Sequence, residues 1–122
     1  MSVTLIGYDR CATCRRAEKF LKERGIQYTR RSIVEQRPTK EELLVWKQSS
    51  GVSWRRFFNS TGQLYRSHHL SGKINGLLEA EILDILSSDG MWLKRPILIT
   101  DHGVSIGFNE IDWLNLLEDR QQ

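Results

Sequence analysis

The position of the two cysteines restricts the possible folds of this chain more than any other feature. Cys11 and Cys14 form a C-x-x-C motif that follows residues 3–8, a short apolar segment typical of a buried β-strand, after a turn at residues 9–10. Residues 14–24 are predicted to form a helix that stops at Gly25. The motif therefore lies where a strand passes into a helix, which favours an α/β arrangement with the helix packed on a sheet.

The start of a helix is a favourable place for a reactive thiol. Cys11 is expected at or near the helix N-cap, where unpaired backbone N–H groups and the positive end of the helix dipole stabilise a thiolate. Cys14 falls in the first turn on the same side. It can therefore reach Cys11 to close a disulfide, or resolve a mixed disulfide formed there.

The composition places the chain among globular proteins. With 122 residues, 39% hydrophobic and 27% charged, it is expected to form a single domain, residues 1–122. No apolar run approaches the roughly 20 residues that span a membrane, and no signal peptide is evident, so we expect no membrane association and a cytoplasmic location. In a reducing cytoplasm, a cysteine pair is catalytic, redox-sensing or metal-binding more often than structural.

Positive charge is concentrated in the first third of the sequence. Residues 1–40 hold ten Lys and Arg against four Asp and Glu, although the net charge of the whole chain is only +3. Four of these cations surround the cysteines: Arg10, Arg15, Arg16 and Lys19. They either lower the thiol pKa further or simply form a solvated helix face. No nucleic-acid-binding motif accompanies them, so a direct nucleic-acid partner is not expected.

The remaining pattern completes the fold prediction. Residues 26–33 are predicted to form a second strand parallel to the first, and Thr39 opens a capping box for a helix that ends at Gly51. A further helix is predicted at residues 77–86.

The β pattern then returns near the end of the chain. Residues 96–100 and 104–108 are predicted to form an antiparallel pair, followed by a helix capped by Asn109. The element order is βαβ, a helical block, then ββα. This order predicts an α/β, thioredoxin-like fold with a mixed four-stranded sheet and a helical insertion at about residues 38–90.

At this level of detail the sequence resembles the arsenate reductase-like family, which includes glutathione- and glutaredoxin-coupled arsenate reductases and the Spx/MgsR type of redox regulator. The resemblance covers essentially the whole chain. It rests on Cys11-Ala12-Thr13-Cys14-Arg15, on the helical middle and on Arg95-Pro96-Ile97 before a strand. Three further segments resemble a branch labelled arsenate reductase-like or Spx-like: residues 57–62, 88–91 and 94–96.

The sequence departs from the arsenate reductases at the residues that bind the oxyanion. In those enzymes three arginines surround the reactive cysteine. Cys11 matches that cysteine and Arg95 matches one arginine, but Asn59 and Phe108 stand where the other two are expected. One cation in place of three removes much of the charge-assisted hydrogen bonding to an arsenate. Those reductases also usually carry a serine or similar residue where this chain has Cys14, and take their second thiol from glutathione.

Pro96 and Arg95 are the remaining candidate site residues. In the thioredoxin fold the proline that begins the third strand is usually cis and faces the redox cysteines, and the resemblance implies that role for Pro96. From the sequence alone Pro96 is also compatible with an ordinary strand start. Arg95 either binds an anionic substrate beside Cys11 or forms a helix cap or surface ion pair.

A zinc site is not expected. His68 and His69 are adjacent, so they point in different directions, unlike the spaced histidines of common two-cysteine, two-histidine sites.

The sequence therefore predicts a thiol–disulfide redox protein with oxidoreductase chemistry, in which Cys11 is the nucleophile and Cys14 the resolving thiol. Arg95 and Pro96 are predicted to contact the substrate. No bound cofactor and no metal are expected; glutathione, glutaredoxin or thioredoxin is a possible thiol co-substrate, and the partner is a thiol or disulfide, small or proteinaceous. Two alternatives remain: an Spx-like redox-sensing regulator that binds RNA polymerase, and a glutathione/glutaredoxin-dependent arsenate reductase.

Overall fold

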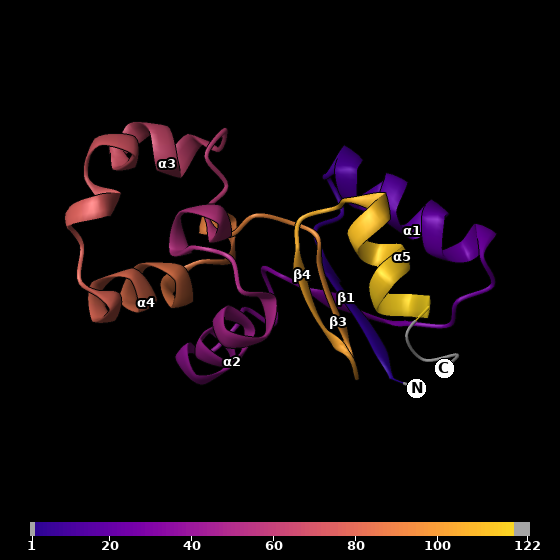
Figure 1. The fold of residues 1–122 in the computed structure, drawn as a ribbon. Coiled ribbons are helices and arrows are strands. Elements are labelled where there is room, and N and C mark those ends of the chain that lie inside the picture. The colour runs from indigo at the N-terminus through magenta and orange to yellow at the C-terminus, as the bar shows by residue number, and fades with distance from the viewer. Residues whose placement is uncertain (1, 119–122) are drawn as a thin grey trace. The chain divides into compact units, whose positions relative to one another are not determined.

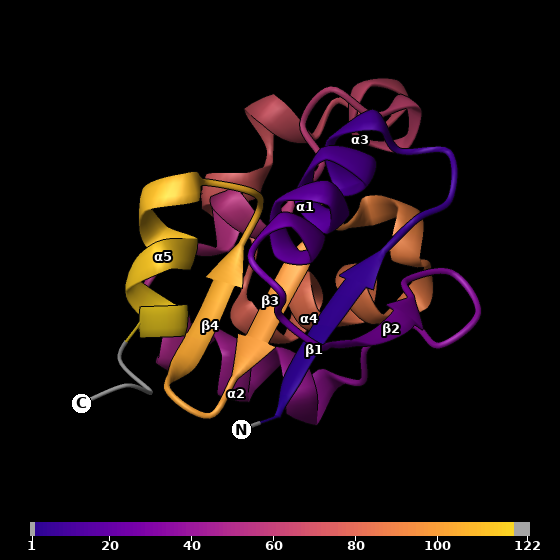
Figure 2. The same ribbon diagram turned by 90° about the vertical axis from the view of Figure 1, so that its right-hand side faces the viewer.

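The computed structural model describes residues 2–118, and the chain divides into two compact units. One unit contains the chain up to Ser32 together with the segment from Arg95 onward, and the other is Ile33–Lys94. The first unit carries the sheet and both cysteines, and the second is built of helices (Figures 1 and 2).

The first unit is a four-stranded mixed sheet with two helices. Its elements are β1 (Val3–Gly7), α1 (Ala12–Glu23), β2 (Thr29–Ser32), β3 (Ile97–Thr100), β4 (Gly103–Ile106) and α5 (Glu110–Glu118). The strand order is β2-β1-β3-β4. β1 pairs parallel with β2 and antiparallel with β3, and β3 pairs antiparallel with β4. The predicted βαβ–ββα order and mixed sheet are confirmed.

Helices α1 and α5 cover the same face of this sheet (Figures 1 and 2). Their apolar residues form one cluster with inward-facing residues of β1 and β3, because alternate strand residues point to the same face. The cluster consists of Val3, Leu5, Ala17, Phe20, Leu21, Leu98, Trp113 and Leu117. Trp113 is fully buried, and its indole Nε1–H donates to the carbonyl of Gly107 at 3.1 Å. This packing fixes α1, and therefore the start of α1, against the sheet.

The second unit consists of short helices. They are α2 (Lys40–Ser50), η1 (Trp54–Phe57), α3 (Gln63–Ser67), η2 (Leu70–Gly72), η3 (Ile74–Gly76), α4 (Glu79–Ser88) and η4 (Gly90–Trp92). The predicted capping box at the start of α2 is present: Thr39 Oγ1 accepts from the Glu42 backbone N–H, and Glu42 Oε1 accepts from the Thr39 backbone N–H. Gly51 ends α2 in the left-handed conformation, as predicted.

Several predicted boundaries in the first βαβ unit are wrong, two of them by two residues or more. α1 begins at Ala12 rather than residue 14, because Cys11 is the N-cap. The strand predicted at residues 26–33 is reduced to Thr29–Ser32. The reason is that Gly25 and Ile26 close α1, with their N–H groups bonded to the carbonyls of Lys22 and Leu21.

Two later boundaries also shift. The helix predicted at residues 77–86 is Glu79–Ser88, because the side chain of Glu81 accepts from the Leu78 backbone N–H at 2.8 Å and starts the helix there. The strand predicted at residues 104–108 ends at Ile106. Gly107 leaves the strand with φ 88°, a conformation that favours glycine.

Gly90 marks a close backbone approach in the helical unit. A Cβ atom at this position would lie only 1.9 Å from the carbonyl oxygen of Ile33. Both groups belong to the backbone, so neither can move away by changing a rotamer. A side chain at residue 90 is therefore incompatible with the observed packing.

We predict that Gly90→Ala destabilises the protein by about 1–3 kcal/mol, the usual cost of overpacking. The measurement is urea denaturation of the full chain followed by tryptophan fluorescence. Gly76→Ala is the matched control, because a Cβ at Gly76 meets nothing within 4 Å. Equal midpoints for the two variants would contradict the close approach at Gly90.

Candidate functional site

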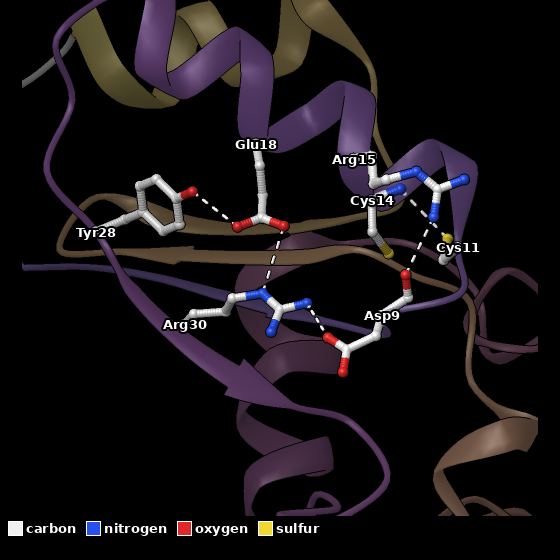
Figure 3. A network of polar contacts seen from close by, with 7 residues as sticks. All are labelled: Asp9, Cys11, Cys14, Arg15, Glu18, Tyr28 and Arg30. Carbon is white, nitrogen blue, oxygen red and sulfur yellow. Dashed lines mark hydrogen bonds and ion pairs between the residues drawn. The ribbon is translucent and has the colours of Figure 1, made fainter.

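The two cysteines lie at the junction between β1 and α1, as predicted. β1 ends at Gly7, and the chain then turns so that the Cys11 N–H donates to the Tyr8 carbonyl at 3.1 Å. Cys11 has an extended backbone (φ −103°, ψ 114°) and is the N-cap of α1. Its Sγ accepts the backbone N–H of Cys14 at 3.3 Å (Figure 3). The sulfur thus occupies the place of an ordinary N-cap oxygen.

The two thiols differ strongly in exposure. Both are free, but Cys11 is half-buried whereas Cys14 is only 1% exposed. Cys14 fits beneath the turn because β1 ends in Gly7: a Cβ there would lie 3.3 Å from the Cys14 Sγ. Sequence reasoning missed Gly7 as a site residue, although a glycine at the end of the strand was a visible signal.

Arg95 and Pro96 lie at the same edge of the sheet. Antiparallel pairing of Ile97 with Ile6 brings the start of β3 to the end of β1, where the cysteine turn begins. The Arg95–Pro96 peptide bond is cis, and the Pro96 carbonyl accepts the Gly107 N–H at 2.8 Å. The guanidinium carbon of Arg95 lies 5.2 Å from the centre of the Tyr8 ring, within the range of a cation–π contact.

The surroundings of Cys11 stabilise its thiolate. Burial by itself raises the pKa of Cys11, but hydrogen bonds from Cys14 and the charge and hydrogen bond of Arg95 lower it by more. The net effect is a pKa below the ordinary value of a cysteine. The thiolate is therefore present at pH values where a free cysteine would be mostly protonated.

Cys14 is shifted in the opposite direction. Burial is the largest cause, and the adjacent Cys11 contributes further through a hydrogen bond and its charge, so the pKa of Cys14 is raised to about 12. A hydrogen bond with the Tyr8 backbone and the charge of Arg95 oppose this rise without cancelling it. Cys14 therefore stays a neutral thiol while Cys11 is a thiolate.

The cations expected around the cysteines are only partly where the sequence suggested. Arg95, which is distant in sequence, is the cation that lowers the pKa of Cys11. Arg15 instead donates its Nη1 to the Asp9 carbonyl at 3.1 Å, and Arg16 donates to Thr13 Oγ1 on the same helix. Sequence proximity thus identified the neighbours of Cys11 along the chain but not its main electrostatic partner.

Phe108 and Asn59 each make defined contacts within their own unit. The Phe108 ring packs edge-on against Phe20 and Trp113, with centroids 5.5 Å and 4.8 Å away. Asn59 stabilises a turn, since its backbone N–H donates to the Trp92 carbonyl at 2.8 Å and its carbonyl accepts the Gly62 N–H. Phe108 therefore belongs to the apolar cluster under α1 and α5.

Within residues 2–118, no group of three or more His, Cys, Asp or Glu is arranged to hold a metal ion. His68 contacts the ring of Trp92, with centroids 5.1 Å apart, and its Nδ1 lies 3.0 Å from the Leu64 carbonyl. In the same part of the chain, every helix is too short or too polar to cross a membrane.

The fold and the cysteine junction agree with the family that the sequence matches. Residues 6–116 match the model of the ArsC family, and this chain belongs to that family. Its fold is thioredoxin-like. A crystal structure of a putative ArsC family related protein from Bacteroides fragilis has 38% sequence identity and a TM-score of 0.91, covering 95% of this chain and 99% of that one.

Two curated relatives cover most of this chain. The uncharacterised protein YusI of Bacillus subtilis is 42% identical over 110 residues, covering 90% of this chain and 93% of the relative. The global transcriptional regulator Spx of Staphylococcus epidermidis is 27% identical over 108 residues, covering 88% of this chain and 81% of the relative. The chain is thus similar both to an uncharacterised protein and, more distantly, to a transcriptional regulator.

We predict that Cys11 reacts with iodoacetamide faster than a free cysteine at neutral pH, and that Cys14, even without Cys11, needs a higher pH than a free cysteine because its burial remains. The sign follows from the shifts, since a lowered pKa keeps the thiolate present at lower pH and a raised pKa removes it. The measurement is the pH profile of alkylation in Cys14→Ser and Cys11→Ser single variants. Faster alkylation of the protein that retains only Cys14 would contradict this assignment.

Proposed function

We propose that this protein is a thiol–disulfide oxidoreductase in which Cys11 is the nucleophile and Cys14 the resolving thiol. The observation that carries the proposal is that two neighbouring thiols lie in opposite environments, with the Cys11 Sγ accepting a hydrogen bond from the Cys14 backbone N–H. Cys11 is accessible, with its thiolate stabilised by the Cys14 N–H and by Arg95, whereas Cys14 is buried and protonated. This is the division of roles that a two-step exchange requires.

In the first step the Cys11 thiolate attacks one sulfur of a partner disulfide. An S–S bond forms between Cys11 and the partner, the partner's own S–S bond breaks, and its other sulfur leaves as a thiolate. In the second step Cys14 loses its proton and attacks Cys11 Sγ, which releases the partner's remaining sulfur. The partner gains two electrons and, at neutral pH, two protons, and the chain is left with a Cys11–Cys14 disulfide.

The first step also prepares Cys14 for the second. Part of the rise in the Cys14 pKa comes from the charge and hydrogen bond of Cys11. Once Cys11 is in a mixed disulfide its negative charge is gone, so that part of the rise disappears. Cys14 then ionises more readily at the moment when its thiolate is needed.

Arg95 and Pro96 are proposed to face the substrate. Arg95 supplies positive charge beside Cys11, and the cis Arg95–Pro96 bond leads into β3 at the edge of the sheet where Cys11 lies. No bound cofactor is needed for this chemistry. A thiol co-substrate in the cytoplasm, of the glutathione, glutaredoxin or thioredoxin type, would reduce the disulfide for the next cycle.

We predict that Cys14→Ser stops the reaction after its first step and accumulates a mixed disulfide on Cys11. The test is incubation of the variant with a cell extract, followed by non-reducing electrophoresis and mass spectrometry of the trapped species. Wild-type protein and Cys11→Ser are the controls and should trap little. An equal yield of adducts from Cys11→Ser would overturn the assigned roles.

A separate experiment addresses a second candidate function, a redox-sensing regulator. The similarity to a global transcriptional regulator favours it. If the cysteine pair is a switch, RNA polymerase subunits should co-purify with the wild-type chain in an amount that changes with oxidant. If the same amount of polymerase is recovered with and without oxidant, the cysteine pair has no regulatory role.

Arsenate reduction is predicted to be weak or absent. Phe108 and Asn59 stand at the sequence positions where the related reductases are expected to carry two of their three arginines. Phe108 packs against Phe20 instead, so neither position supplies a cation to an arsenate. The assay combines arsenate, glutathione and glutaredoxin with wild-type protein and with Cys11→Ser. Turnover comparable to a dedicated arsenate reductase, lost in Cys11→Ser, would instead establish arsenate as a substrate.

A further inference from the structure

A chain of polar contacts connects β2 and α1 to the turn that precedes Cys11 (Figure 3). The Tyr28 hydroxyl donates to Glu18 Oε1 at 2.8 Å, and Glu18 Oε2 lies 3.4 Å from Arg30 Nε. The other end of the same guanidinium donates from Nη2 to Asp9 Oδ1. One arginine thus bridges a carboxylate on the helix and a carboxylate on the cysteine turn.

The geometry of β2 explains why this bridge forms. Tyr28 and Arg30 are two residues apart along an extended segment, so both point to the face covered by α1. The side chain of Glu18 is 17% exposed, whereas that of Asp9 is 81% exposed. The inner contact with Glu18 therefore orients the guanidinium, and the outer contact holds a carboxylate that would otherwise be free in solvent.

Asp9 is held through its backbone as well. Its carbonyl accepts from Arg15 Nη1 at 3.1 Å, so β2 and α1 both contact this residue. Its neighbour Tyr8 accepts the Cys11 N–H and lies against the guanidinium of Arg95. The contacts of Asp9 therefore fix the turn that sets the distance between Cys11 and Arg95.

We propose that Arg30 is a positioning residue for Cys11: by bridging Glu18 and Asp9 it holds the cysteine turn in the conformation that keeps the thiolate beside Arg95. This inference rests on the proposed function, because it concerns the same nucleophile. Arg30 does not touch the sulfur in this arrangement. It acts through Asp9, Tyr8 and the backbone between them.

A purely electrostatic role for the pair makes a different prediction. If Asp9 and Arg30 acted on Cys11 only through their charges, removing the negative Asp9 would stabilise the thiolate and removing the positive Arg30 would destabilise it. The two substitutions would then shift Cys11 in opposite directions. If the two residues act as one clamp, either substitution releases the turn and both shift Cys11 in the same direction.

The experiment measures alkylation of Cys11 as a function of pH in the Cys14→Ser protein, where Cys11 is the remaining thiol. The variants are Arg30→Gln, Asp9→Ala and the double substitution. Lys22→Gln is the control, because it removes one positive charge from α1 outside the bridge. Urea denaturation of each variant separates loss of the turn from loss of the fold.

We expect both single variants to alkylate about threefold more slowly than the parent at neutral pH, a modest effect in keeping with a partly exposed ion pair. The double variant should match the singles, with a raised Cys11 pKa in all three and no change in Lys22→Gln. Opposite shifts in the two single variants, or rates equal to the parent in both, would overturn the clamp. A parent rate no faster than free cysteine would overturn the proposed function instead, independently of the differences between variants.

Discussion

The hydrogen bond from the Cys14 backbone N–H to Cys11 Sγ is the interaction on which the rest of the site depends. It forms because a helix start leaves backbone donors without partners, and here a sulfur takes the position of the usual capping oxygen. The geometry requires β1 to end at Gly7 and the chain to turn through Tyr8 before α1 begins. The same bond that starts the helix therefore also lowers the pKa of the nucleophile.

The sheet brings a cation to Cys11 that the segment around the cysteines does not provide. A single βα junction can present two thiols, but the cation beside Cys11 comes from a residue more than eighty positions along the chain. Antiparallel pairing of β3 with β1 brings Arg95 to the junction, and the cluster around Trp113 holds α1 on the sheet. The stability of the apolar cluster and the reactivity of Cys11 are thus linked through the position of one helix.

Much of this arrangement could be predicted from the sequence, because it depends on short-range patterns. The N-cap position of Cys11, the capping box at Thr39 and the βαβ–ββα order each follow from local residue types. The long-range contacts could not be predicted in this way. Local residue patterns do not distinguish Arg95 from Arg15 as the partner of the thiolate; only the resemblance to the arsenate reductases indicated Arg95. The bridge from Arg30 to Asp9 depends on a register that one sequence does not specify.

The burial of Cys14 bears on how the protein would withstand oxidants. A peroxide arriving from solvent meets the sulfur of Cys11 first, since Cys14 is 1% exposed. The sulfenic acid formed there would have a second thiol within the same helical turn, and condensation of the two, with loss of water, would compete with further oxidation to the irreversible sulfinic acid. An interior thiol packed against Gly7 would in this way protect the half-buried Cys11 from permanent damage.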